Sequence, residues 1–105
     1  MSKTLTFNES FSILEGMEII FKQKTNGKLA IKLYKITRPL KTLVEDYKEL
    51  VSKVEGKENS EVWIKNVSDI NNSPFAEFET LTLEELEELE LTPQCLVLIE
   101  PIIEQ

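Results

Sequence analysis

The chain has 105 residues, of which 41% are hydrophobic and 30% charged, and its formal net charge is −7. This length is typical of one domain, so we expect residues 1–105 to form a single domain with one core. Residues 1–57 carry a net charge of +4, whereas residues 58–105 carry −11. Such a split indicates an acidic surface that faces a cationic partner, or two opposite surfaces that pair internally or with a second copy.

The composition weakens most catalytic hypotheses. The chain has no His and one Cys, so it lacks the commonest general base and cannot build the usual zinc site alone. Cys95 lies in an apolar segment and is expected to be an inert buried thiol. The three glycines are too far apart for a phosphate-binding loop. We therefore expect no enzyme activity and no catalytic, cofactor-binding or metal-binding residue.

Location is predicted from what the sequence lacks. No apolar run approaches the roughly 20 residues that span a bilayer. The first seven residues lack a signal-peptide pattern, and one cysteine permits no intramolecular disulfide. We expect a cytoplasmic protein that is not secreted and does not contact a membrane.

The first elements are a strand and a helix. Residues 3–7 alternate polar and apolar side chains, which predicts a short strand. Asn8 is the expected cap of a helix over residues 9–24. Gly16 costs this helix about 1 kcal/mol relative to Ala and weakens its continuity.

A longer helix is predicted over residues 28–55. The turn signal at residues 26–27 makes it the second arm of an antiparallel helical hairpin. Pro39 interrupts its hydrogen bonds, so we expect a kink there or two coaxial segments. Its apolar stripe steps by three or four residues: Leu29, Leu33, Ile36, Leu40, Val44, Tyr47, Val51 and Val54.

The next segment permits two readings. Ser60 can cap a short helix over residues 61–70, in which Trp63 shares a face with Val67 and Ile70, but this run also fits a strand. After a firm break, residues 75–82 alternate with a one-residue slip and are expected to pair with residues 3–7.

Two short helices end the chain. Thr82 and Glu85 form a capping box for a helix over residues 83–89. Thr92 and Pro93 start the last helix, in which residues 95–99 are apolar all round and should be buried. The predicted fold class is therefore α+β and mainly helical, with a two- or three-stranded antiparallel sheet.

The sharpest local feature is an acidic cluster in the first of these short helices. Leucines at three-residue spacing, Leu83, Leu86 and Leu89, are expected to face inward. One reading is a docking surface for a basic protein or a mimic of nucleic-acid phosphate; the other is an ordinary solvated helix face. The carboxylates are Glu84, Glu85, Glu87, Glu88 and Glu90.

Two other sets of residues are candidate contact sites: the lysines of the long helix and the aromatic side chains. The lysines of the long helix are interrupted by acids in an acidic chain, so no direct nucleic-acid binding is expected. Tyr34 and Ile31 point away from the apolar stripe, whereas Tyr47 belongs to it. Tyr34 and Trp63 are therefore candidate contacts, either with a partner or with each other and the last helix.

Three stretches carry a family resemblance: residues 5–21, residues 27–36 (Gly-Lys-Leu-Ala-Ile-Lys-Leu-Tyr-Lys-Ile) and residues 81–100 (Leu-Thr-Leu-Glu-Glu-Leu … Leu-Thr-Pro … Leu-Ile-Glu). The chain resembles a family of small bacteriophage and prophage proteins, mostly of low-GC Gram-positive bacteria. Pro39 departs from the family pattern. The resemblance covers most of the chain and implies phage origin and action in the bacterial host cytoplasm; the family has no assigned activity.

The leading functional prediction is a non-enzymatic phage accessory protein that acts by protein–protein contact, as an assembly factor or as a modulator of a host protein. The partner is expected to present a basic surface. One alternative is an acidic, nucleic-acid-mimicking inhibitor of a host defence or nucleic-acid-binding protein. A second is a self-associating structural component, that is, a homo-oligomer.

Overall fold

A computed structural model describes residues 2–104 of the chain. Over this range the chain is mainly helical with one two-stranded antiparallel sheet, which confirms the predicted α+β class. The elements are β1 (Ser2–Thr6), α1 (Phe7–Ile20), α2 (Gly27–Thr37), the 3₁₀ segment η1 (Arg38–Thr42), α3 (Leu43–Lys53), α4 (Glu61–Asn71), β2 (Pro74–Glu79), α5 (Leu83–Glu87), α6 (Pro93–Ile99) and the 3₁₀ segment η2 (Glu100–Ile102).

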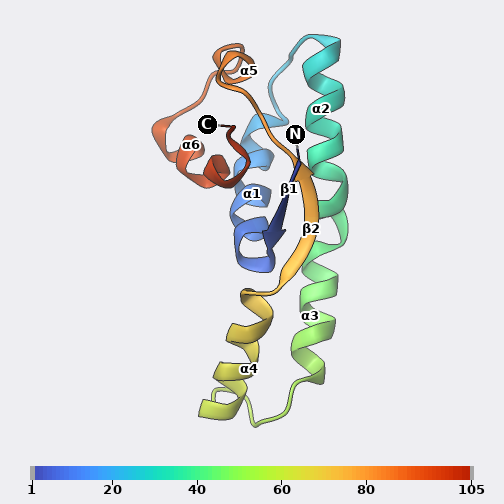
Figure 1. Cartoon of the computed structure of the whole chain (residues 1–105), viewed down its shortest axis with the longest axis vertical. Helices are drawn as coiled ribbons and strands as arrows, with labels where there is room; N and C mark the ends of the chain where they lie inside the picture. The colour runs from blue at the N-terminus through green and yellow to red at the C-terminus, as the bar shows by residue number, and fades with distance from the viewer. Residues whose placement is uncertain (1, 105) are drawn as a thin grey trace.

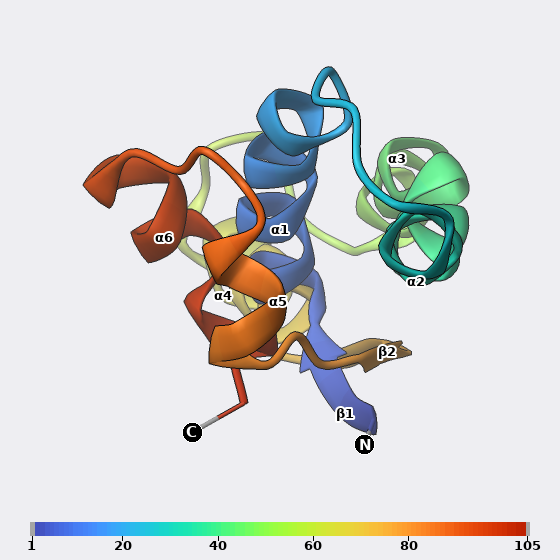
Figure 2. The ribbon, with the colours of Figure 1, turned by 90° about the horizontal axis from the view of Figure 1, so that it is seen from above.

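The helices α1 and α2 run antiparallel, as the predicted hairpin requires (Figure 1). Seen from above, α1 lies between α6 on one side and the α2–α3 run on the other, and the sheet lies along one side of this arrangement (Figure 2). The core fills the space between these elements. Its fully buried side chains come from β1, α1, α2, α3, β2, α6, η2 and the link between β2 and α5, and include Leu5, Ile13, Ile36, Phe78 and Ile99.

β1 and β2 pair in antiparallel register, as predicted, with Leu5 opposite Ala76. Thr6 lies opposite Pro74, so Phe75 is an extra residue that forms a bulge. The bulge accounts for the slip in the apolar alternation of this segment. It turns Phe75 toward Phe7, with ring centroids 5.0 Å apart.

The cap of α1 differs from the prediction. Thr6, not Asn8, is the N-cap, and its hydroxyl accepts a hydrogen bond from the Glu9 N–H at 3.1 Å. The Glu9 carboxylate in turn accepts from the Thr6 N–H at 3.0 Å, which completes a capping box. This Thr-x-x-Glu signal was present in the sequence, and it starts the helix two residues earlier than expected.

Gly16 does not interrupt α1. A Cβ atom at this position would lie 2.5 Å from Ile99 Cγ2, so the glycine lets α6 approach α1 closely. The loss of helix propensity at Gly16 is therefore accompanied by a gain in packing between two helices that lie far apart in the chain.

The long helix is one helical run from residue 27 to residue 53, divided at η1. Pro39 lies in the first turn of η1, where its missing N–H does least harm. Each 3₁₀ residue turns about 20° more than an α-helical residue, so five residues shift the apolar face by about 100°, or one residue. Leu43 is consequently buried, whereas Val44, predicted for the stripe, is 41% exposed.

Beyond η1, α3 and α4 form an arm that extends from the rest of the molecule (Figure 1). The extents are 48 × 24 × 23 Å and the radius of gyration is 15.5 Å, against about 13 Å for a compact chain of this length. The sequence of residues 61–70 fits either a helix or a strand; in the structure these residues are helical and capped by Ser60. On α4, Trp63, Val67 and Ile70 are half-buried and no residue is fully buried.

The C-terminal segment is less buried than its composition predicts. The capping box at Thr82 and the Thr92 cap of α6 are confirmed. In α6, Cys95 and Ile99 are buried, but Val97 is 66% exposed, because α6 packs one face against α1. Within residues 2–104, no helix has the length and apolar character needed to cross a bilayer.

Candidate functional site

The acidic cluster forms a corner of the molecule at α5 and the turn that follows it. We call this surface the acidic corner; it comprises Glu84, Glu85, Glu87, Glu88 and Glu90. Leu86 and Leu89 are buried beneath it and fix α5 to the core. Leu83, predicted to face inward, is 64% exposed, because it occupies the first position of α5 and lies off the buried face.

Glu85 belongs to the interior side of this corner. Its Oε1 lies 2.7 Å from Lys32 Nζ on α2 and also accepts from the Thr82 N–H at 2.9 Å and the Thr82 hydroxyl at 3.1 Å. Partial burial acts to raise the pKa of Glu85, but the hydrogen bonds from Lys32 and Thr82 outweigh this effect and hold the pKa below its usual value. Glu85 is thus engaged within the fold.

The link between α1 and α2 holds the other end of the corner. Asn26 Nδ2 donates to Glu88 Oε2 at 2.6 Å. The Gln23 amide bonds the backbone of Glu90 twice: its Nε2 donates to the Glu90 carbonyl at 2.6 Å, and its Oε1 accepts from the Glu90 N–H at 2.9 Å. These contacts orient the turn that carries both carboxylates.

Glu84 and Glu87 form the open side of the corner. Both are exposed and follow the exposed Leu83 of α5 by one and four residues. A single leucine bordered by carboxylates combines an apolar anchor with a charged rim, the arrangement found at many contact surfaces. The acidic segment is therefore packed on the Lys-rich helix at Glu85 and open at Glu84 and Glu87.

Tyr34 and Trp63, the aromatic candidates, lie on separate surfaces. α2, which carries Tyr34, and α4, which carries Trp63, lie toward opposite ends of the long axis, and α6 lies on the far side of α1 (Figures 1 and 2). Neither α4 nor α6 therefore covers the side of α2 that faces away from α1. Tyr34 is 49% exposed, with Lys41 Nζ 5.8 Å from its ring centroid. Trp63 is half-buried and lines a cleft of ≈ 440 Å³ between α3 and α4, with Val51, Val54 and Gly56.

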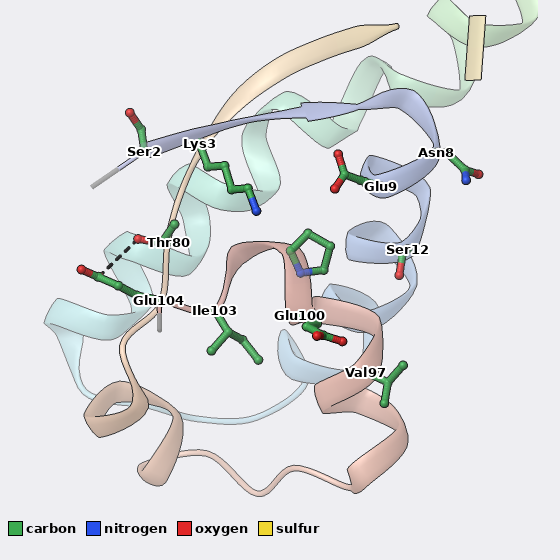
Figure 3. A pocket seen from close by; sticks show the side chains of 11 residues that line it. Ser2, Lys3, Asn8, Glu9, Ser12, Thr80, Val97, Glu100, Ile103 and Glu104 are labelled. Carbon is green, nitrogen blue, oxygen red and sulfur yellow. Dashed lines mark hydrogen bonds between the residues drawn. The ribbon is translucent and has the colours of Figure 1, made fainter. Parts of the chain in front are cut away.

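One groove had no signal in the sequence. It has a volume of ≈ 780 Å³ and lies between β1, the start of α1 and the C-terminal turn (Figure 3). Its lining includes Lys3 from β1, Glu9 from α1 and Glu100 from η2. Only the tertiary fold brings residues 3 and 100 to one site.

The single thiol of the chain lies in the interior of the fold. Cys95 is fully buried and its Sγ lies 3.8 Å from the Gly16 carbonyl oxygen. Burial raises the pKa of Cys95, which disfavours the nucleophilic thiolate. Within residues 2–104, no three His, Cys, Asp or Glu side chains are placed to hold one metal ion.

Comparison of the chain with protein-family models, with curated proteins and with solved structures gives no match. The indications of function therefore come from the surfaces described above.

Proposed function

We propose that this chain is a non-enzymatic protein that acts by binding another protein through the acidic corner. The observation that carries this proposal is the exposed Leu83 of α5, followed by the exposed Glu84 and, one turn later, by the exposed Glu87. An apolar side chain at such a position adds nothing to the core, whereas it can be buried against a partner.

The negative charge of the acidic corner favours a partner with a basic surface. Lys32 is already bound to Glu85, and no ion pair within residues 2–104 involves Glu84 or Glu87, so these two carboxylates remain available to a basic surface. Complementary charge raises the rate of association and makes it sensitive to salt. A partner with a basic rim around an apolar pocket fits this surface.

The test compares three forms of the chain as bait in bacterial lysate, at low and at physiological salt. The corner variant combines Leu83→Ala, Glu84→Lys and Glu87→Lys. The matched control combines Glu15→Lys and Glu18→Lys, two exposed positions on α1 with the same change in charge. We expect a captured protein that is lost with the corner variant and retained with the control.

Two results would reject the proposal: capture of no specific protein by the unmodified chain, or equal capture by the corner variant. If the captured protein binds DNA or RNA and is released by either, the acidic corner acts by imitating nucleic acid. On the sequence resemblance alone, we further propose that the partner is a cytoplasmic protein of a bacterium that hosts a phage.

A further inference from the structure

Two hydrogen bonds define which edge of β1 is free. The Phe7 N–H donates to the Ser73 carbonyl at 3.1 Å, on the β2 side, whereas the Thr6 N–H donates to Glu9 Oε1 at 3.0 Å, on the other side. Backbone groups of successive strand residues point to alternate sides. The N–H and C=O of Thr4 therefore point away from β2, on the same side as the Thr6 N–H.

This free edge faces the groove. The Glu9 carboxylate, which accepts the hydrogen bond from the Thr6 N–H, lines the groove together with Ser2 and Lys3 of β1. Figure 3 shows Lys3 reaching into the space between β1 and the C-terminal turn. Thr4 is exposed, and no segment outside the sheet makes a hydrogen bond with its backbone within residues 2–104. One donor and one acceptor are thus open beside a cleft.

We propose that the groove binds an extended peptide segment of a partner protein, which adds to β1 as a third strand. Strand addition supplies the two missing partners of the Thr4 backbone. The groove is walled opposite β1 by Val97, Glu100 and Ile103, so it is suited to a single extended segment more than to a second folded copy.

The lining predicts the chemistry of the peptide. Glu9, Glu100 and Glu104 outnumber Lys3, so the groove is acidic and complements a Lys or Arg side chain. Glu9 is engaged in the α1 cap and Glu104 accepts from the Thr80 hydroxyl at 3.3 Å, whereas Glu100 is exposed. We therefore expect a basic residue of the peptide at the Glu100 wall and an apolar residue beside it.

This inference depends on the proposed function only in requiring a protein partner, since it uses a different surface from the acidic corner. The probe is a displayed library of random heptapeptides, selected on the full chain. The decisive variant is Thr4→Pro, which removes the groove-facing N–H but leaves the β1–β2 hydrogen bonds. Thr4→Val is the matched control, because it keeps the N–H.

We expect enriched peptides with a basic residue in an otherwise strand-forming sequence. Thr4→Pro should weaken their binding about tenfold or more, and Thr4→Val should not. Glu100→Lys, on the opposite wall, provides a second test that leaves β1 unchanged and should also weaken binding. The corner variant should bind these peptides normally, which separates this inference from the proposed function.

Amide hydrogen exchange tests the edge directly in the unmodified chain. The Thr4 amide should exchange fast in the free protein and slowly with an enriched peptide bound, while the Leu5 amide is protected in both. Absence of enriched peptides, peptides that bind the Thr4→Pro and Glu100→Lys variants as well as the unmodified chain, or a Thr4 amide protected by dimerisation of the chain would each overturn the inference.

Discussion

Lys32 Nζ on α2 lies 2.7 Å from Glu85 Oε1 on α5, and this contact joins the basic half of the chain to the acidic half. Both side chains are about three-quarters buried, with exposures of 23% and 28%. The ion pair therefore positions the acidic corner against the long helix. It also makes the attachment of α5 sensitive to pH.

The pH dependence follows from the lowered pKa of Glu85. A carboxyl group whose pKa is depressed by folding contributes stability above its unfolded pKa, and the contribution is lost as the pH falls through the folded pKa. Glu85→Gln should lower the free energy of unfolding by about 1 kcal/mol at neutral pH. The difference should vanish well below pH 4.5 in urea titrations.

Glu49→Gln provides the control for this measurement. Its pair with Lys53 spans one helical turn, and both side chains are about two-thirds exposed. Its effect should be small at every pH. An equal effect of the two substitutions would show that the Lys32 contact does not hold α5.

A methyl group at position 16 should destabilise the protein. Gly16→Ala gains about 1 kcal/mol of helix propensity but places Cβ 2.5 Å from Ile99 Cγ2, in a buried contact that cannot open without moving α6. We expect a net loss of about 1 kcal/mol in thermal or urea unfolding. Gly27→Ala, with no atom within 4 Å of the new Cβ, should be neutral or stabilising. A stabilised Gly16→Ala variant would contradict the close packing of α1 and α6.

The Tyr47 hydroxyl should contribute to the attachment of the arm. It donates to Asn71 Oδ1 at 2.6 Å, and its ring packs edge-on against Phe11, with centroids 5.1 Å apart. Tyr47→Phe keeps the ring but removes the hydrogen bond, so unfolding should require about 1 kcal/mol less. Tyr34→Phe, at an exposed ring, should change stability by less than about 0.5 kcal/mol.

The leucines of α5 should differ in their effect on stability. Leu86 is 6% exposed, so Leu86→Ala should cost about 2–4 kcal/mol through loss of burial and formation of a cavity. Leu83 is 64% exposed, so Leu83→Ala should stay within about 0.5 kcal/mol of the unmodified chain in urea unfolding. A large loss from Leu83→Ala would place this side chain in the core and remove the anchor of the acidic corner.

Local signals in the sequence predicted the elements well. The caps at Ser60, Thr82 and Thr92 each depend on a few neighbouring residues, and each is present. Asn8 was wrong as a cap because the competing Thr6–Glu9 capping box satisfies two backbone groups at once. The burial of Val44 was wrong because a constant α-helical period does not hold through a 3₁₀ segment.

The surfaces were less predictable, because they depend on distant residues. The composition of α5 indicated an acidic surface, but the sequence could not separate Glu85, which meets Lys32, from Glu84, which does not. The groove beside β1 combines residues 2–12 with residues 80–104, and no local pattern relates these segments. Whether the candidate residues bind a partner remains a prediction.

The five residues of η1 also set the direction of the α3–α4 arm. An insertion or deletion of one residue in this 3₁₀ segment would rotate everything beyond it by about 120° about the helix axis. The arm and the rest of the molecule would each keep their own internal contacts, but Tyr47 would swing away from the aromatic rings of α1. Length variation should therefore be tolerated in the α3–α4 loop and not in η1. The number of residues in η1 fixes the rotation of α3 relative to α2 about the helix axis.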